Sequence, residues 1–379
     1  MNKKILTVYD DNDHLNNVIS ALTLKADEIF FVYHHEVNKK NFENIDKVLK
    51  KYLEIRTTYI MLEDDKKQLS EIFQQNKDLI VDVGGAKYLS LVLFEMVKDT
   101  DNKIIYYDDD ENCIKDYRSH TILYENVFKL QIEDVLCLRG GEIKEYMHRS
   151  VNDKQAKDAI VSLVENNMEN YGAFIRYITK LNSIISSAHY LGANTYQLEE
   201  NQRLDLISDA VYDRISELFA IKEGKLKFTS KKLKEMTAVA GAFLENYLYI
   251  KLSESGKFDD IKMSAVIDFA EEKYIYPVHC EIDCLIIKDN KLLFVSCKST
   301  KADASTLNEI YVHNHRFGNV LSMPVLCVCE DLDRKYPSTY AKGEELGIYL
   351  VDRSSFMNGE ISEVFASILD GTYVYDLIS

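Results

Sequence analysis

The segment Pro277-Val-His-Cys-Glu-Ile-Asp-Cys-Leu-Ile-Ile-Lys-Asp-Asn-Lys-Leu-Leu-Phe-Val-Ser-Cys-Lys298 decides how the second half of the chain folds. Two apolar runs, Cys280–Ile287 and Lys291–Cys297, lie on either side of Asp289-Asn290, a dipeptide that favours a tight turn. The pattern therefore predicts a β-hairpin.

The charged residues of this hairpin fall on shared faces, because side chains alternate along a strand. Glu281 and Asp283 point the same way on the first strand, and Ser296 and Lys298 do so on the second. Two carboxylates beside a lysine can hold a hard divalent cation and stabilise a phosphate transition state. A hairpin with its charges simply in solvent is the structural alternative, and the local pattern leaves both open.

Composition indicates a globular protein of two or more domains. The chain has 379 residues, 46% of them hydrophobic, with only 14 Gly and 3 Pro. No apolar run approaches a membrane span, and the first residues lead into a strand pattern rather than a signal peptide, so we expect a soluble, cytoplasmic protein. The seven cysteines are expected to be buried, reduced thiols, and Cys327-Val-Cys329 lacks the spacing of a zinc site.

The net charge of −16 argues against a general nucleic-acid coat protein, since duplex binding depends on phosphate neutralisation. It is compatible with an enzyme that has a local basic groove. Residues 222–235 hold six lysines against two glutamates and are one candidate for such a groove. A solvated, partly helical surface is the alternative for this segment.

Residues 1–110 alternate between strand and helix patterns, which predicts a parallel sheet covered on both faces. The expected strands are Ile5–Tyr9, Ile29–Tyr33, Thr57–Met61, Leu79–Val83 and Ile104–Tyr107, and the expected helices are Leu15–Leu24, Phe42–Tyr52, Leu69–Gln75 and Tyr88–Val97. Ligands of such sheets bind beyond the carboxyl ends of the strands. Two loops take that position: Asp10-Asp11-Asn12-Asp13 and Gly84-Gly85-Ala86-Lys87.

The second loop has the chemistry of an anion or nucleotide contact. Its two glycines allow a ligand to approach the backbone, the following helix offers free N–H groups, and Lys87 adds a cation. A glycine-eased turn with an exposed lysine is the structural alternative. The chain has neither a GxGxxG nor a GxxxxGK[ST] motif, so a dinucleotide-binding or P-loop NTPase assignment lacks support.

The remaining sequence predicts a few more strands, a helical connector and a second α/β region. Strands are expected within His120–Lys129 and at Ile132–Leu138, and connector helices at Ala156–Asn166, Phe174–Ser187 and Leu204–Phe219. The second region is expected to contain, in order, helix Thr237–Leu252, strand Ile261–Phe269, the hairpin, helix Thr306–Arg316, strand Val325–Cys329, helix Ala341–Leu346, strand Ile348–Val351 and helix Ser362–Leu369. Glu245 is a lone acid in the apolar helix, and a buried carboxylate there would need a metal or another cation.

These motifs, in this order, resemble the CARF-domain effector nucleases of type III CRISPR systems, in which a CARF sensor is joined to a PD-(D/E)xK nuclease. The resemblance spans essentially the whole chain and rests on Leu79–Val83 with Gly84–Lys87, Gly241-Ala-Phe-Leu-Glu245, Glu281-Ile-Asp283 and Cys297-Lys298-Ser299. It implies a Rossmann-like CARF domain (residues 1–141), a helical connector (142–235) and a restriction-endonuclease-like α/β/α domain (236–379).

The resemblance also implies an activity. The CARF domains of a homodimer would bind a cyclic oligoadenylate second messenger, usually the tetramer, and thereby activate cleavage of single-stranded RNA or DNA with Mn²⁺ or Mg²⁺ in antiviral defence. The ligand-binding residues it implies are Asp10, Asp11, Asn12, Gly84, Gly85, Ala86 and Lys87. Asp283 would bind the metal, Lys298 would orient the attacking water and stabilise the phosphorane, and Glu245 would complete the metal site.

One position departs from the family pattern. The second strand of the family usually reads Glu-x-Lys, whereas this chain has Ser296-Cys297-Lys298, and a hydroxyl is a weak ligand for a hard cation. Either Glu245, Glu281, Asp283 and the Cys297 carbonyl still form a working site, or the protein is a ligand receptor with a degenerate nuclease domain. A ring nuclease, in which the CARF cleft itself cleaves the ligand beside Lys87, is a third alternative.

Overall fold

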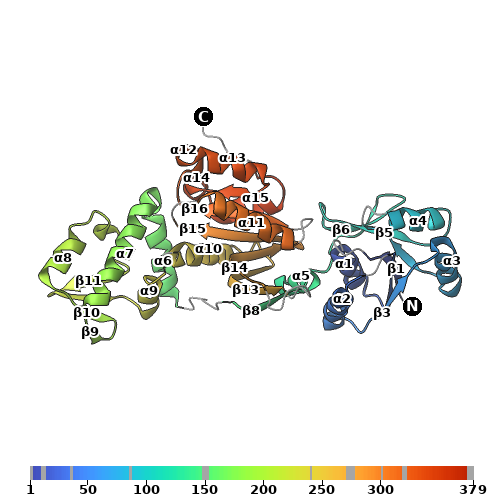
Figure 1. Cartoon of the computed structure of the whole chain (residues 1–379), viewed down its shortest axis with the longest axis horizontal. Helices are drawn as coiled ribbons and strands as arrows, with labels where there is room; N and C mark the ends of the chain where they lie inside the picture. The colour runs from blue at the N-terminus through green and yellow to red at the C-terminus, as the bar shows by residue number, and fades with distance from the viewer. Residues whose placement is uncertain are drawn as a thin grey trace. The chain divides into compact units, whose positions relative to one another are not determined.

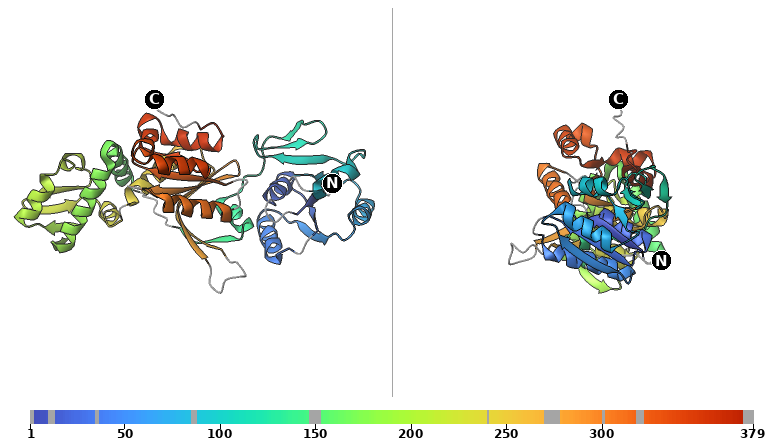
Figure 2. Two further views of the ribbon diagram at one scale, coloured as in Figure 1. Left: turned by 45° about the horizontal axis from the view of Figure 1, so that its top comes forward. Right: turned by 90° about the vertical axis from the view of Figure 1, so that its right-hand side faces the viewer.

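The architecture is taken from a computed structural model of the chain (Figures 1 and 2). It describes residues 3–9, 14–34, 37–84, 88–146, 153–239, 241–269, 278–299, 302–317 and 322–373. Contacts divide the chain into two compact units. The first contains residues 1–144 with the short segments 267–279 and 317–321, and the second contains the rest.

The first unit is built on a seven-stranded sheet with the order β3-β2-β1-β4-β5-β6-β7. Its strands are β1 (Lys4–Val8), β2 (Glu28–Tyr33), β3 (Arg56–Met61), β4 (Ile80–Asp82), β5 (Ile104–Asp108), β6 (Cys113–Asp116) and β7 (Ile122–Tyr124). The strands from β3 to β5 pair in parallel, and β6 and β7 continue the sheet in antiparallel fashion. The predicted parallel sheet is confirmed.

Helices alternate with the parallel strands as the apolar spacing predicts. They are α1 (Leu15–Leu24), α2 (Lys39–Tyr52), α3 (Asp65–Gln75) and α4 (Tyr88–Val97). The chain builds outward from β1 through β2 to β3, then returns to the other side of β1 to form β4 and β5. The order of strands therefore reverses between β1 and β4, which is where sheets of this kind bind ligands.

The expected strand at Ile132–Leu138 is wrong, because this segment forms helix α5 (Ile132–Leu138). A seven-residue apolar run does not distinguish a strand from a helix by periodicity alone. The helix is favoured by acids in its first turn, where Asp134 accepts a hydrogen bond from the Gln131 N–H at 3.1 Å. Asp134 is 3% exposed and also accepts hydrogen bonds from the side chains of Lys51 (2.8 Å) and Tyr52 (2.5 Å) on α2.

The connector is more mixed than predicted. It contains α6 (Lys154–Glu165), α7 (Tyr171–Ser187), α8 (Glu200–Ile207) and α9 (Lys231–Met236), with a four-stranded sheet of order β11-β12-β10-β9 formed by β9 (His189–Gly192), β10 (Thr195–Gln197), β11 (Phe219–Lys222) and β12 (Lys225–Phe228). The first two predicted helices are confirmed, but the expected helix at Leu204–Phe219 ends at Ile207. Asp209 accepts a hydrogen bond from the Val211 N–H at 3.1 Å and so favours a turn over another helical residue.

The predicted hairpin lies within a six-stranded sheet of order β17-β16-β15-β14-β13-β8. Its strands are β8 (Gly141–Glu145), β13 (Asp260–Phe269), β14 (Val278–Lys288), β15 (Lys291–Lys298), β16 (Ser322–Val328) and β17 (Tyr349–Val351). Asp289 and Asn290 have φ of 51° and 64°, as a two-residue hairpin turn requires. β15, β16 and β17 pair in parallel, and their buried residues include Leu293, Val295 and Val325.

Helices complete this α/β region. They are α10 (Ala242–Ser255), α11 (Ala304–Phe317), α12 (Leu332–Lys335), α13 (Pro337–Glu345), α14 (Arg353–Asn358) and α15 (Ile361–Leu369). The predicted helix starting at Thr237 begins too early, because Thr237 ends α9, donating its N–H and Oγ1–H to the Lys234 carbonyl. Among the described residues, none of the helices combines the length and apolar composition that crossing a membrane requires.

The Asp134 contacts yield a stability prediction. Asp134→Ala removes the α5 cap and leaves Lys51 and Tyr52 without their shared acceptor, so we expect a loss of about 2 kcal/mol in the free energy of unfolding. Chemical denaturation of the variant measures this, with Glu133→Ala as a control in the same helical turn. Equal stability of Asp134→Ala and wild type would contradict the assigned role.

Candidate functional site

The carboxyl ends of β1 and β4 meet where the strand order reverses, as the two predicted ligand loops require. Asp10, Asp11, Asn12, Gly85, Ala86 and Lys87 lie outside the described residues, so their ligand contacts stay predictions. Gly84 is described, and its N–H donates to Asp82 Oδ1 at 2.9 Å. A Cβ on Gly84 would lie 3.1 Å from the same oxygen, so the backbone of Gly84 packs closely against the side chain of Asp82.

Asp82 is a buried carboxyl directly beneath the start of that loop. It is 1% exposed, and burial raises the pKa of Asp82 to about 6, against the Gly84 N–H and the nearby polar side chains of Ser20 and Asn17, which lower it. Among the described residues, Asp82 Oδ2 has no hydrogen-bond partner. A carboxyl that holds the loop backbone is thus expected to change protonation in mildly acidic solution.

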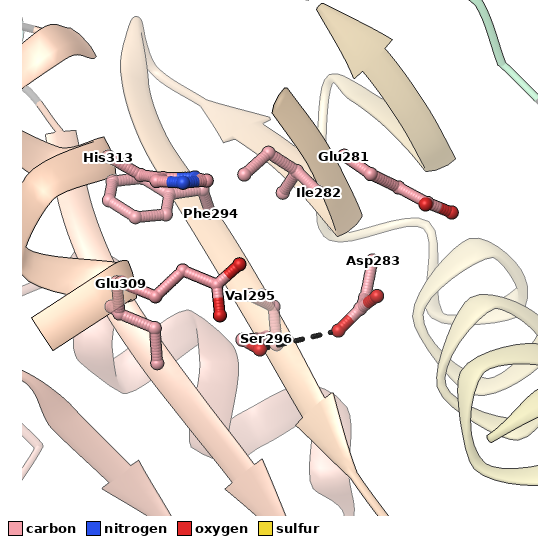
Figure 3. A pocket seen from close by; sticks show the side chains of 9 residues that line it. Glu281, Ile282, Asp283, Phe294, Val295, Ser296, Glu309 and His313 are labelled. Carbon is pink, nitrogen blue, oxygen red and sulfur yellow. Dashed lines mark hydrogen bonds between the residues drawn. The ribbon is translucent and has the colours of Figure 1, made fainter. Parts of the chain in front are cut away.

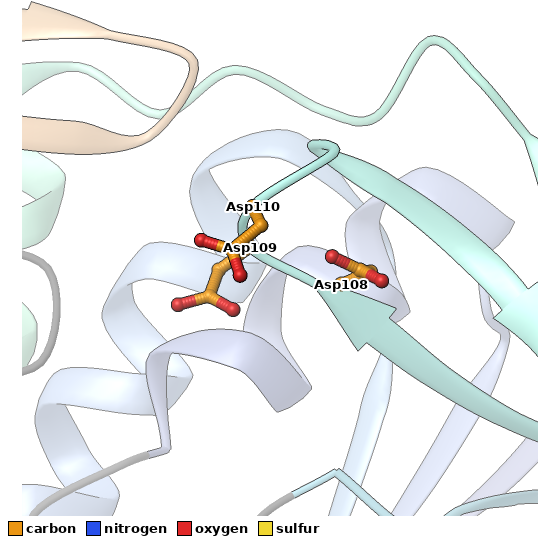
Figure 4. A group of neighbouring side chains, drawn as sticks. All are labelled: Asp108, Asp109 and Asp110. Carbon is orange, nitrogen blue, oxygen red and sulfur yellow. The ribbon is translucent and has the colours of Figure 1, made fainter. Parts of the chain in front are cut away.

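A second acidic group, Asp108–Asp110, lies at the end of β5 (Figure 4). These three residues bring carboxylate oxygens within 4.8 Å of one another. Lys115 forms ion pairs with Asp108 at 2.7 Å and Glu111 at 2.9 Å. Burial acts to raise the pKa of Asp108, but the hydrogen bond and charge of Lys115, together with the backbone N–H groups of Glu111 and Asp110, hold the pKa below its ordinary value. Because Lys115 already neutralises part of this negative charge, we assign the group no metal ion.

Asp283 lies on β14 directly beyond the last residue pair between β14 and β15. Backbone pairing runs from Lys288–Lys291 to Cys284–Val295. Beyond it, Asp283 Oδ2 accepts the Cys297 N–H at 2.6 Å and the Ser296 hydroxyl at 3.4 Å. No described residue donates a hydrogen bond to Oδ1 of Asp283, so one carboxylate oxygen remains available to a cation.

The charges and burial around Asp283 suit a carboxylate that binds a cation. Burial raises the pKa of Asp283, the Cys297 N–H and the charge of Lys298 lower it, and the charge of Glu281 raises it again. A bound cation would offset the cost of holding this charge in a half-buried position. The positive charge of Lys298 lowers the pKa of Asp283, and Lys298 forms no ion pair with any described residue.

The main chain at Cys297 offers a further oxygen. The N–H and C=O of one strand residue point to the same neighbouring strand. Since the Cys297 N–H donates to Asp283 on β14, the Cys297 carbonyl faces the same side. Hard cations accept carbonyl and carboxylate oxygens, so Asp283 and this carbonyl are chemically suited to Mg²⁺ or Mn²⁺.

Glu245 lies in the first turn of α10, half-buried, with its side chain folded back over Gly241. A Cβ on Gly241 would come within 2.6 Å of Glu245 Oε1, so glycine permits this placement. Its proximity to the hairpin shows in Cys284: burial raises the pKa of that thiol, and the charges of Asp283 and Glu245 both add to the rise.

A pocket in front of the hairpin contains a residue that the sequence reasoning missed (Figure 3). Its lining residues are Glu281, Ile282, Asp283, Phe294, Val295, Ser296, Glu309, Ile310 and His313. Asp283 faces Ser296 across the strands, and Glu281 is directed away from both Ser296 and Glu309. Glu309 is the single acid within α11, and the missing acid at position 296 was the signal to look for it.

The part of the chain that the structure describes has no trio of Asp, Glu, His or Cys side chains at this hairpin with ligand atoms within 4.8 Å of one another. A cation here would therefore use main-chain oxygen and draw carboxylates toward it. The structure brings Asp283, Ser296 and Cys297 together and places Glu281, Lys298 and Glu245 around them. Their catalytic roles stay predictions.

No protein-family model matches the sequence. No curated protein matches it either. Among solved structures, protein VC1899 from Vibrio cholerae is similar over 96% of this chain and 98% of its own, with 15% sequence identity and a TM-score of 0.75.

Can2 from Sulfobacillus thermosulfidooxidans, solved in complex with cyclic tetra-adenylate, is similar over 95% of this chain and 98% of its own, with 17% identity and a TM-score of 0.69. The chain therefore has the fold of these two proteins along nearly its whole length. This agreement confirms the predicted fold class, with its Rossmann-like and nuclease-like α/β domains, and confirms at the level of the fold the resemblance to CARF-domain effector nucleases.

Asp82 yields a pH prediction. Its pKa is about 6 in the folded chain against an ordinary value of 3.8, so wild type should lose stability relative to Asp82→Asn as pH rises between these values. The difference should reach at most about 3 kcal/mol and level off above pH 6. Thermal unfolding of both proteins from pH 4 to 8 measures it, with the exposed Asp78→Asn as control. A pH-independent difference would contradict the raised pKa.

Proposed function

We propose that this protein is a metal-dependent nuclease of single-stranded RNA or DNA, activated by a cyclic oligoadenylate, in a type III CRISPR antiviral response. The observation that carries the proposal is the arrangement at the hairpin. A half-buried carboxylate with one oxygen that accepts no hydrogen bond from a described residue, a carbonyl on the same side and a lysine without an ion pair among the described residues lie together in a fold shared with Can2.

The sensor half supports an activator of this chemical class. Its sheet reverses strand order between β1 and β4, where a glycine-containing loop begins. The Can2 structure that shares this fold contains cyclic tetra-adenylate. We therefore propose the tetra-adenylate as first candidate, bound by the Asp10–Asn12 and Gly84–Lys87 loops of two CARF domains in a homodimer in the cytoplasm.

At the hairpin, Asp283 and the Cys297 carbonyl would hold Mn²⁺ or Mg²⁺, with Glu245 contributing from α10. The cation supplies Lewis-acid activation of water and charge neutralisation at the phosphate. Lys298 orients the attacking water and stabilises the negative charge on the phosphorane through its ammonium group. Cys297 and Ser296 donate to Asp283 Oδ2 and keep the carboxylate in place.

Activation requires the ligand to bind the active arrangement more tightly than the resting one. The direct test incubates the protein with cyclic tetra- or hexa-adenylate, Mn²⁺ and labelled single-stranded RNA or DNA. Cleavage that depends on both ligand and metal is expected. No cleavage in any combination would overturn the nuclease proposal.

If ligand binding and cleavage use different residues, variants of the hairpin should lose cleavage and keep ligand affinity. Asp283→Ala and Lys298→Ala should each lower cleavage at least about 100-fold, because they remove charge that stabilises the transition state. Cyclic tetra-adenylate affinity, measured by calorimetry, should stay unchanged. Lys291→Ala, at the turn end of the same strand, should leave both properties intact. A parallel loss of ligand binding in the hairpin variants would refute the two-site assignment.

A second candidate function is a ligand receptor without nuclease activity. The observation that favours it is Ser296, whose hydroxyl stands where the family pattern has a carboxylate. Ser296→Glu distinguishes the two functions. Cleavage gained only in the variant would indicate a degenerate site, whereas active wild type would support the nuclease.

A further inference from the structure

The catalytic hairpin lacks an acid at the position of Ser296, and the pocket beside it supplies one from another element. The Ser296 hydroxyl is directed to Asp283 Oδ2 at 3.4 Å. Across the pocket, α11 contributes Glu309 and His313, which are four residues apart and so share one face of the helix. Figure 3 shows the Glu309 carboxylate directed toward Ser296, on the side of the strands that Asp283 also faces.

The helix that carries Glu309 is anchored on both sides of it. Leu307 and Ile310 are 0% and 4% exposed, so the helix packs through residues adjacent to Glu309. One turn further on, Cys280 Sγ lies 2.6 Å from His313 Nδ1, which ties the same helical face to β14. These contacts fix the backbone of Glu309 beside the hairpin.

The carboxylate itself is left uncommitted by these contacts. Glu309 is exposed at the pocket rim, and it makes no hydrogen bond or ion pair with any residue in the described ranges. Besides Asp283 and Glu309, the pocket is lined by the acid Glu281, but its carboxylate is directed away from Ser296. Glu309 is therefore the acid whose direction matches the gap left by serine.

We propose that Glu309 is a metal ligand that replaces the missing strand carboxylate and completes a divalent-cation site with Asp283 and the Cys297 carbonyl. This inference rests on the proposed nuclease function, because it assigns a ligand to the same site. With Glu245 contributing from α10, the set becomes three carboxylates and a carbonyl, all of them oxygen ligands that suit Mg²⁺ and Mn²⁺. Ser296 then acts through Asp283, by donating to its oxygen, rather than on the metal.

The test measures Mn²⁺ binding apart from catalysis, by electron paramagnetic resonance of the full-length protein. The hairpin site is defined as the binding that Asp283→Asn removes. Glu309→Gln should weaken this component at least about tenfold and lower cleavage with it. Glu345→Gln, an exposed acid on α13, should change neither, and cyclic tetra-adenylate affinity should be the same in all variants.

A double variant that removes the carboxylate at position 309 and adds one at position 296 tests whether the two positions can replace each other. In the Glu309→Gln background, Ser296→Glu should restore at least part of the lost Mn²⁺ affinity, which an effect of Glu309 on folding alone would not allow. If Asp283→Asn weakens Mn²⁺ binding and Glu309→Gln does not, the role of Glu309 is overturned while the nuclease proposal stands. If neither variant changes Mn²⁺ binding, both proposals fail together.

Discussion

The hydrogen bond from the Cys297 N–H to the Asp283 carboxylate is the contact on which the candidate catalytic site depends. In a regular hairpin this N–H would pair with a backbone carbonyl of the facing strand. Here a side chain takes it, so the backbone ladder ends and a carboxylate is held between two strands. The same contact orients the Cys297 carbonyl, because both main-chain groups of one residue face the same neighbour. One bond therefore positions two oxygens of different chemistry.

A related contact occurs in the first unit. Asp82 ends β4 and accepts the N–H of Gly84, the first residue of the glycine loop. In both halves an aspartate at or near the end of a pairing region holds backbone that would otherwise lack a partner, and in both burial raises the pKa of the carboxyl. The difference lies in what faces the acid: Asp82 is surrounded by neutral Asn17 and Ser20, whereas Asp283 has Lys298 nearby.

The parts of the fold that could be predicted from the sequence are those determined by residues close together in the chain. The turn at Asp289-Asn290 and the helices α1 to α4 were predictable, because turn chemistry and apolar spacing act over a few residues. The segment Ile132–Leu138 was wrong because seven apolar-rich residues fit a strand or a helix. The strands β9 to β12 have only three or four residues each and give almost no alternation to detect.

The residues of the candidate site also differ in whether the local sequence could reveal them. Asp283, Ser296 and Lys298 were accessible from the sequence because strand alternation places them on the hairpin. Glu309 was not, since nothing near it in sequence marks it as functional and only the packing of α11 brings it beside β15. The serine in the motif was a clue to a missing acid, but only the fold could say which acid is near.

The thiol of Cys297 lies buried, whereas the N–H of the same residue contacts the candidate site. A hydrogen bond with Cys327 and burial together raise the pKa of this thiol, so it remains protonated and sheltered inside the sheet. Alkylating reagents should pass it by, and sensitivity to them would say nothing about catalysis. The residue between the serine and the lysine can therefore be exchanged for another small apolar one without altering the centre, because its side chain serves only the interior.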